Sequence, residues 1–139
     1  MMSDELLEAL EKIFAADSEL YQQRGFQRRI GFGKRPALIN IDLANAWTRP
    51  GNPFSCLNMD VIIPATQQLL VAARAAGIPI VFTSTAYDAP AGLHSDMGLW
   101  HKKIPTEILQ AGSELCAIDD RVAPMADELV IEKKRASGF

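Results

Sequence analysis

The sequence has few cysteines and no excess of basic charge. Its two cysteines, Cys56 and Cys116, lie far apart and match neither a C-x-x-C redox motif nor a set of zinc ligands. We therefore expect both to be buried or half-buried thiols. The 14 basic residues are outnumbered by 17 acidic ones, giving a formal charge of -3, which argues against binding to a nucleic-acid backbone.

Long apolar runs are also missing. None approaches the roughly 18 residues that cross a bilayer, and the first 21 residues lack the basic start and apolar centre of a secretory signal. We expect a cytoplasmic protein with neither a membrane nor a nucleic-acid partner. Hydrophobic residues nevertheless make up 48% of the chain, enough for the core of one small domain.

Residues 3–24 have the period of an amphipathic helix. Ser3 and Asp4 favour a helix start, and Gly25 is expected to end the helix. We treat residues 1–30 as an N-terminal helical arm, and the pattern leaves open whether it packs on its own domain or on a neighbouring subunit. The apolar positions that repeat at mostly three- and four-residue spacing are Leu6, Leu7, Leu10, Ile13, Phe14, Leu20 and Tyr21.

Three short apolar segments, 36–43, 78–84 and 128–133, are predicted to be strands, the first buried on both faces and the second also buried. Residues 61–76 are predicted to form a helix that Asp60 caps and Gly77 ends. The order strand, helix, glycine, strand is that of a right-handed βαβ unit, so the fold class is α/β with parallel strands. Residues 45–58 are predicted to be a loop, and a short helix is expected near 105–110.

Two charged residues, Asp42 and Lys133, close the first and third predicted strands. Ligands of open parallel sheets bind outside the carboxyl ends of the strands, where such a pair can do acid–base chemistry. The alternative is that Asp42 caps a loop and Lys133 neutralises it. That structural role is the commoner one for parallel sheets in general, and the pattern alone leaves both open.

Four segments, taken in order, resemble the isochorismatase-like cysteine hydrolases. They are RGFQRRIG (24–31), RPALINIDLANAW (35–47), DMGLWHKKIPTE (96–107) and VIEKKRASGF (130–139), and the similarity covers nearly the whole chain. The second segment resembles the family's first catalytic strand. The resemblance implies a partial three-layer Rossmann-like sheet, truncated relative to the family fold, with 31–139 as the N-terminal half of the hydrolase domain.

In that family an aspartate, a lysine and a cysteine form the catalytic trio, and the resemblance places the first two at Asp42 and Lys133. Lys134 is the alternative in register. Lys133 is preferred because it lies four residues before Ser137, as the family lysine precedes its serine. The family nucleophile lies about one βα unit further along, so we expect it beyond Phe139 and not at either cysteine of this chain.

The resemblance implies hydrolysis of the carbamoyl or amide C–N bond of a small carboxylate such as N-carbamoylsarcosine through a cysteine acyl-enzyme. Asp42 would take the thiol proton and later return it, while Lys133 would favour the thiolate. Asn45 and Trp47 are expected to contact substrate, and Trp100 to close the pocket or a subunit contact. No cofactor is implied. No metal is expected either, because 83–91 lacks the aspartate and histidine cluster of related nicotinamidases.

Three functions remain in competition on the sequence alone. The first is the carbamoyl hydrolase, as an incomplete chain that needs its missing half for activity and forms a homo-oligomer, a tetramer in the family, when full length. The second keeps the fold and the trio but acts on another small amide such as maleamate. The third is a non-catalytic module that binds a partner through an unpaired strand, which would leave an apolar strand edge bare.

Overall fold

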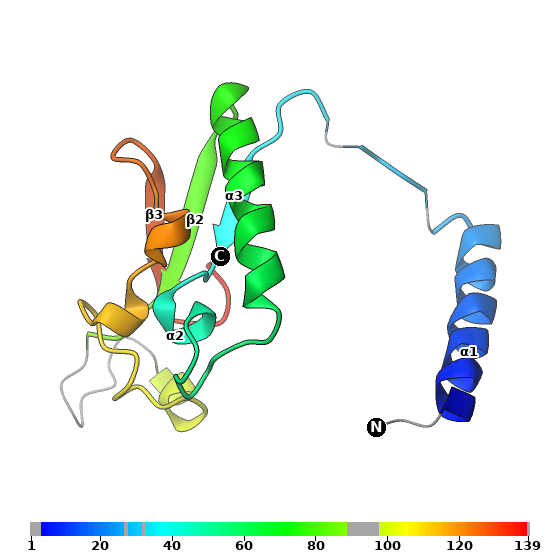
Figure 1. Ribbon diagram of the computed structural model, residues 1–139, viewed down its shortest axis with the longest axis horizontal. Helices are drawn as coiled ribbons and strands as arrows, with labels where there is room; N and C mark the ends of the chain where they lie inside the picture. Colours follow the sequence, from blue (N-terminus) through cyan, green and yellow to red (C-terminus); the bar gives the residue numbers. More distant parts are fainter. Residues whose placement is uncertain (1–3, 27, 32, 89–97, 139) are drawn as a thin grey trace. The chain divides into compact units, whose positions relative to one another are not determined.

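The computed structural model describes residues 4–26, 28–31, 33–88 and 98–138. The chain divides into two compact units, Met1–Lys34 and Arg35–Phe139. The first unit contains helix α1 (Asp4–Gln23), and the second contains the sheet and all other helices (Figure 1). Residues 96, 97 and 139, which belong to the segments that carry the family resemblance, lie outside the described residues.

Helix α1 confirms the predicted amphipathic helix. It ends two residues before Gly25, whose φ of +79° lies in the left-handed region that glycine adopts without strain. The amide of Gly25 donates to the carbonyl of Gln22, which satisfies one of the last carbonyls of the helix. The glycine therefore acts as the predicted stop.

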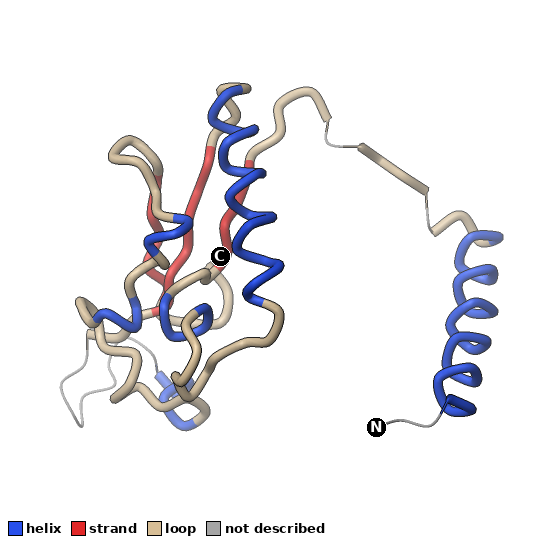
Figure 2. The backbone as a smooth tube through the Cα atoms, viewed as in Figure 1, coloured by secondary structure: helices blue, strands red, loops and turns tan. Residues whose placement is uncertain are grey.

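The second unit is built on three parallel strands, as predicted. Strands β1 (Leu38–Ile41), β2 (Ile80–Thr85) and β3 (Leu129–Lys133) lie in the order β1-β2-β3, shown in red in Figure 2. Helix α3 (Met59–Ala75) forms the crossover between β1 and β2, and Gly77 follows it with a φ of +65°. Each strand therefore points its carboxyl end toward the same edge of the sheet.

The main hydrophobic core lies between the sheet and α3. Because side chains alternate along a strand, Leu38 of β1 and Ile80 and Phe82 of β2 face this helix. The opposite face bears Ile39 and Ile41, which are 46% and 64% exposed. The prediction that the first strand is buried on both faces is wrong for the described residues, since α3 covers one face. The buried core residues are Ile63, Leu70, Ala73, Ile80, Phe82 and Val122.

Three local predictions are also wrong. Residues Asn45–Thr48 form a short helix, α2, whose first amide donates to the carbonyl of Ala117 in a distant segment. Helix α3 begins after Asn58, at a φ of 62°, so Asp60 lies in the first turn and is not the cap. Residues 105–110 form turns, because the backbone from 109 to 111 hydrogen-bonds to Tyr87 in a short bridge.

The two cysteines differ in exposure. Cys116 is buried, as predicted, in a second cluster with Ala46, Ala86 and Tyr87. Cys56 is exposed, which corrects the prediction; it lies in irregular backbone between α2 and α3. Among the described helices, none combines the length and apolar character needed to span a membrane.

Phe82 is the largest apolar side chain that is fully buried between the sheet and α3. We expect Phe82→Ala to lower the free energy of unfolding by about 3–5 kcal/mol, because it removes apolar contacts and leaves a cavity. Val71→Ala, at an exposed position of the same helix, should change it by less than about 0.5 kcal/mol. Urea titration monitored by circular dichroism measures both; equal losses would contradict this placement of the core.

Candidate active site at the carboxyl ends of the strands

Asp42 and Lys133 form an ion pair across the end of the middle strand. The Nζ atom of Lys133, the last residue of β3, lies 2.6 Å from Oδ2 of Asp42, which follows β1, although these two strands are not adjacent. The lysine side chain is 4% exposed and the aspartate side chain 26% exposed. A nearly buried ammonium requires a charged partner, and Asp42 provides it.

Two threonines of β2, which the sequence interpretation missed, complete the surroundings of Asp42. Thr83 donates from Oγ1 to Oδ1 of Asp42 at 2.7 Å, and Thr85 donates to Oδ2 over a longer 3.5 Å. The carboxylate therefore receives hydrogen bonds on both oxygens. A polar Thr-Ser-Thr run at the end of the second predicted strand was the signal available in the sequence.

The backbone of Asp42 has an unusual conformation. Its φ is 55°, in the left-handed region that few residues other than glycine, asparagine and aspartate enter. The amide N–H of Asp42 donates to the carbonyl of Thr83 at 3.1 Å, continuing the pairing of β1 with β2 by one residue. The strand thus ends in a sharp turn that directs the carboxylate toward Lys133.

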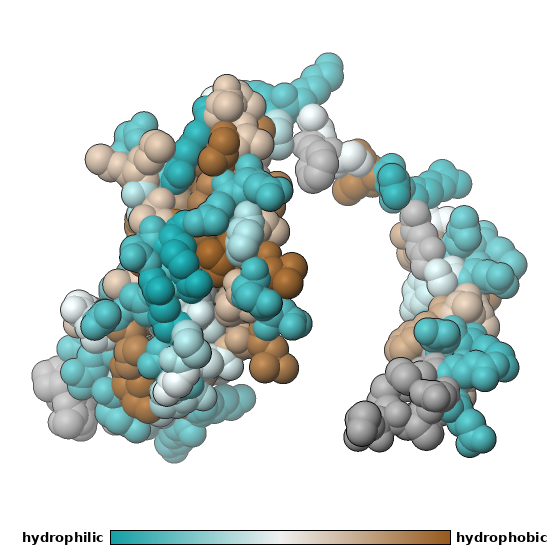
Figure 3. Space-filling view, viewed as in Figure 1, coloured by the Kyte–Doolittle hydropathy of each residue, from teal (hydrophilic) through white to brown (hydrophobic). Residues whose placement is uncertain are grey.

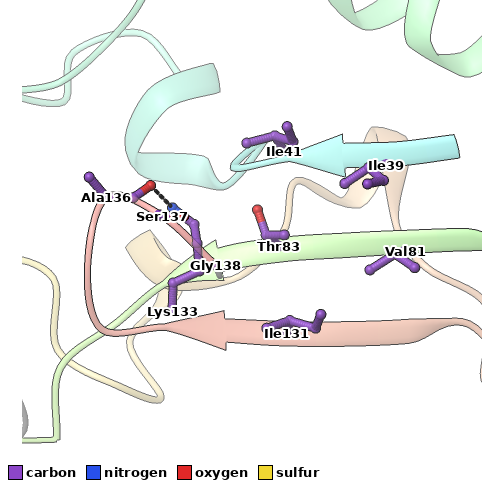
Figure 4. Close-up of a pocket in the computed structure, with 9 residues that line it drawn as sticks. All are labelled: Ile39, Ile41, Val81, Thr83, Ile131, Lys133, Ala136, Ser137 and Gly138. Atoms are coloured by element: carbon purple, nitrogen blue, oxygen red, sulfur yellow. Dashed lines mark hydrogen bonds between the residues drawn. The ribbon is translucent and has the colours of Figure 1, made fainter.

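A groove of about 530 Å³ lies on the sheet face opposite α3 and reaches Lys133 (Figure 4). Its floor is apolar and comes from all three strands, and the loop after β3 borders the end at which Lys133 lies. The carbonyl of Ala136 in that loop accepts a hydrogen bond from Nζ of Lys133 at 3.3 Å. The lining residues are Ile39, Ile41, Val81, Thr83, Ile131, Lys133, Ala136, Ser137 and Gly138.

The three residues predicted to contact substrate lie in other surroundings. Asn45 donates from Nδ2 to the carbonyl of Glu114 at 2.9 Å, and Trp47 packs at a tilt against Phe54 with ring centroids 4.9 Å apart. Trp100 donates from Nε1 to the hydroxyl of Tyr87 at 3.0 Å. None of the three is among the described residues that line the groove. Their substrate contacts stay predictions.

A buried carboxylate, Asp119, fixes the segment that follows Asp42. It is 0% exposed, accepts from Oγ1 of Thr48 at 2.5 Å, and binds both Arg49 and Arg121. The hydrogen bonds from Arg121, followed by those from Thr48, hold the pKa of Asp119 far below its usual range against the effect of burial. Residues 43–49 are therefore anchored to residues 117–121.

Neither cysteine of the chain lies in the groove that Lys133 lines. Burial raises the pKa of the Cys116 thiol, which disfavours the thiolate needed for attack. Among the described residues, no group of three or more histidine, cysteine, aspartate or glutamate side chains is placed to hold a metal ion. The arrangement at Asp42 can therefore supply a base and a cation.

Comparison with known proteins assigns a family to this geometry. Residues 36–139 match the isochorismatase domain. The chain belongs to the isochorismatase family. This agrees with the family expected from the sequence segments, and the parallel α/β sheet agrees with the expected fold class.

Relatives in the isochorismatase family include two amidases of known name. N-carbamoylsarcosine amidase of Arthrobacter sp is 56% identical over 137 residues, covering 96% of this chain and 52% of the relative. Maleamate amidohydrolase of Pseudomonas putida is 36% identical over 113 residues, covering 81% of this chain and 52% of the relative. The chain spans about half the length of these curated relatives.

Solved structures support the isochorismatase-family fold. A cysteine hydrolase from Pseudomonas syringae pv. phaseolicola aligns with a TM-score of 0.67 at 26% identity, over 74% of this chain and 48% of that one. N-carbamoylsarcosine amidase from Thermoplasma acidophilum aligns with a TM-score of 0.60 over 76% of this chain and 56% of that one. At 20% identity, the second likeness shows the fold alone.

Removing the charge of Asp119 should destabilise the unit. We expect Asp119→Asn to cost about 2–3 kcal/mol, because two arginines lose their buried partner. Asp127→Asn is the matched control, since Asp127 is exposed and lies outside the hydrogen bonds of Asp119. Denaturation measured at pH 7 tests the difference; a control as damaging as Asp119→Asn would contradict the anchoring role.

The same carboxylate predicts a response to acid. Because the folded-state pKa of Asp119 lies below the unfolded value of about 3.9, its stabilisation is present above that pH and is lost as the pH falls below it. Asp119→Asn should therefore lose less stability than the parent chain when the pH falls from about 5 to 2. Parallel curves of unfolding free energy against pH would show that Asp119 does not contribute.

The hydrogen bond from Thr83 to Asp42 should be worth more than the one from Thr85. We expect Thr83→Val to lower the unfolding free energy by about 1 kcal/mol, because Oδ1 of Asp42 loses its 2.7 Å donor. Thr85→Val, which removes the 3.5 Å contact, should cost less. Urea titration of the two isosteric variants compares them directly, and a larger loss for Thr85→Val would refute this order.

Proposed function

We propose that this chain supplies the base and the cation of an amidohydrolase that cleaves N-carbamoylsarcosine to sarcosine, carbon dioxide and ammonia. The observation that carries the proposal is the 2.6 Å pair of Lys133 and Asp42 at the strand ends, next to a groove with an apolar floor. The 56% identity to N-carbamoylsarcosine amidase of Arthrobacter sp supports the choice of substrate.

In the proposed reaction Asp42 accepts the proton of a cysteine thiol, and the thiolate attacks the carbamoyl carbon. The nucleophile would come from the part of the family domain that this chain does not span. As the tetrahedral intermediate collapses, Asp42 returns the proton to the departing nitrogen and ammonia leaves. Water then cleaves the thiocarbamate that joins the cysteine to the sarcosine nitrogen, which regenerates the thiol, and the released carbamate loses carbon dioxide to give sarcosine.

Lys133 and Thr83 would act on Asp42 during these steps. With its Nζ atom 2.6 Å from Oδ2, Lys133 stabilises the carboxylate and favours a thiolate nearby. Thr83 holds the other oxygen, so the carboxylate keeps one orientation beside Lys133. We further propose that Asn45, Trp47 and Trp100 shape the substrate pocket and that the complete enzyme is a cytoplasmic homo-oligomer.

A second small amide is the alternative substrate. The 36% identity to maleamate amidohydrolase of Pseudomonas putida favours maleamate over other amides as that candidate. Both substrates carry a carboxylate and release ammonia, so the proposed roles of Asp42 and Lys133 are the same for each. The relative rates at which the complete protein hydrolyses N-carbamoylsarcosine and maleamate distinguish these two candidates.

The test is ammonia release by the full-length protein that contains this chain. We expect N-carbamoylsarcosine to be hydrolysed in preference to maleamate, and Asp42→Asn and Lys133→Ala each to lower kcat by about 10²–10⁴-fold. Asn accepts the left-handed backbone at position 42, so this variant removes the charge alone.

Lys134→Ala is the matched control. The neighbouring lysine pairs with Asp88 and Glu132 and not with Asp42, so its loss should change kcat less than about threefold. If Lys133→Ala stayed active and Lys134→Ala were inactive, the catalytic role would be reassigned from Lys133 to Lys134. Turnover of maleamate alone would replace the proposed substrate.

A further inference from the structure

The sheet face opposite α3 is apolar, and no described helix of its own unit covers it. Its side chains come from all three strands and line the groove in Figure 4. Ile39, Ile41 and Ile131 are 46%, 64% and 37% exposed, and hydrophobic residues also reach the surface elsewhere on this unit (Figure 3). We call Ile39, Ile41, Val81 and Ile131 the open face. Because parallel sheets are normally covered on both faces, the open face is suited to a second layer of helix.

Strand β1 is also open along one side. Among the described strands, its only neighbour is β2. The amide of Asp42 donates to the carbonyl of Thr83, toward β2. Because backbone groups alternate in direction along a strand, those of Ile39 and Ile41 point away from β2. We call this side the β1 edge; no proline or charged residue interrupts Leu38–Ile41, so the β1 edge can accept another strand.

The handedness of the connections indicates what fits both surfaces. Helix α3 connects β1 to β2, and the connection from β2 to β3 contains the short helix η3 (Asp120–Val122). Val122 packs in the core under α3, so both connections lie on one face of the sheet. A right-handed connection from β3 to the free side of β1 would advance in the opposite direction and cross the open face. A helix on the open face, followed by a strand on the β1 edge, therefore fits here.

The second unit holds its site geometry without that further layer. Residues Arg35–Phe139 form a compact unit with their own core against α3. Within this unit Nζ of Lys133 lies 2.6 Å from Oδ2 of Asp42, and Thr83 holds the other carboxylate oxygen. The base and the cation are thus in position before another strand is added. The covering layer therefore does not have to belong to the same polypeptide.

We propose that the open face and the β1 edge bind the remainder of an isochorismatase domain as a separate polypeptide, through an apolar-faced helix and a strand parallel to β1. The chain spans 52% of each of the two named amidases, so a second chain of similar length completes the domain. A strand parallel to β1 ends at the same edge of the sheet as Asp42, which brings the residues after that strand to the ion pair. Docking does not depend on the proposed reaction, whereas activity of the complex rests on it.

The experiment supplies the completing part as a separate chain. The whole 139-residue chain is co-produced with an affinity-tagged polypeptide, the part of N-carbamoylsarcosine amidase of Arthrobacter sp that follows the matched segment. The two polypeptides should co-purify at a ratio of one to one. Hydrogen exchange at the amides of Ile39 and Ile41 should slow at least about tenfold in the complex, because these amides gain strand partners.

Two glutamate variants test where the second polypeptide binds. Ile41→Glu places a charge on the open face and should weaken association at least about tenfold, because docking would bury the carboxylate. Val71→Glu is the matched control, since Val71 is 67% exposed on α3 and Ile41 is 64% exposed; it should change association less than about threefold. Circular dichroism of each variant alone should match the parent chain, because both positions are exposed there.

Ammonia release from N-carbamoylsarcosine by the complex is measured separately. A complex that forms without releasing ammonia would contradict the proposed reaction and still support the docking. Failure of the two polypeptides to co-purify would overturn the docking proposal, as would equal losses for Ile41→Glu and Val71→Glu. Slow exchange at Ile39 and Ile41 in the chain alone would mean that a second copy occupies the β1 edge, which also overturns it.

Discussion

The ion pair between Lys133 and Asp42 is the contact on which the arrangement of this unit depends. It joins Asp42, which follows β1, to Lys133, which ends β3, and β2 lies between these two parallel strands. A nearly buried ammonium without its carboxylate would be strongly unfavourable. The pair therefore links the topology of the sheet to the chemistry at its edge.

The two faces of the sheet have different roles around that pair. On one face, α3 packs against Ile80 and Phe82 and gives the strands a rigid support. On the other, alternating residues of the same strands form the apolar floor of the groove that reaches Lys133. The segment after Asp42 is held separately, by the buried carboxylate of Asp119 and its two arginines. Different sets of contacts thus hold the helix that supports the sheet, the groove, and the segment that follows Asp42.

Membership of the isochorismatase family gives these contacts a chemical context. The chain spans about half the length of its curated relatives, and within that half it carries a carboxylate and an ammonium in direct contact. The similarity to N-carbamoylsarcosine amidase of Arthrobacter sp extends over 96% of the chain. Helix α1 lies outside the isochorismatase match, which covers residues 36–139.

Much of the architecture could be predicted from local patterns. Apolar runs of strand length indicated the strands correctly. The helical period of α1 and α3, and the glycine that follows each of these helices, indicated the helices. These signals can be read from the sequence because they depend on neighbouring residues alone. The wrong predictions arose because these signals are local. The short helix α2 and the turns at 105–110 depend on backbone pairing with distant segments, near 117 and at Tyr87, which no local pattern records.

The sequence by itself determined the fold class, the family, and the placement of Asp42 and Lys133 at strand ends. Only the tertiary structure decided that the two charges touch, that Thr83 holds the second oxygen of Asp42, and that Asn45, Trp47 and Trp100 lie outside the groove. The reason is physical: residue type and spacing fix which edge of a sheet a residue reaches. Strand order and side-chain packing fix which neighbours it meets there.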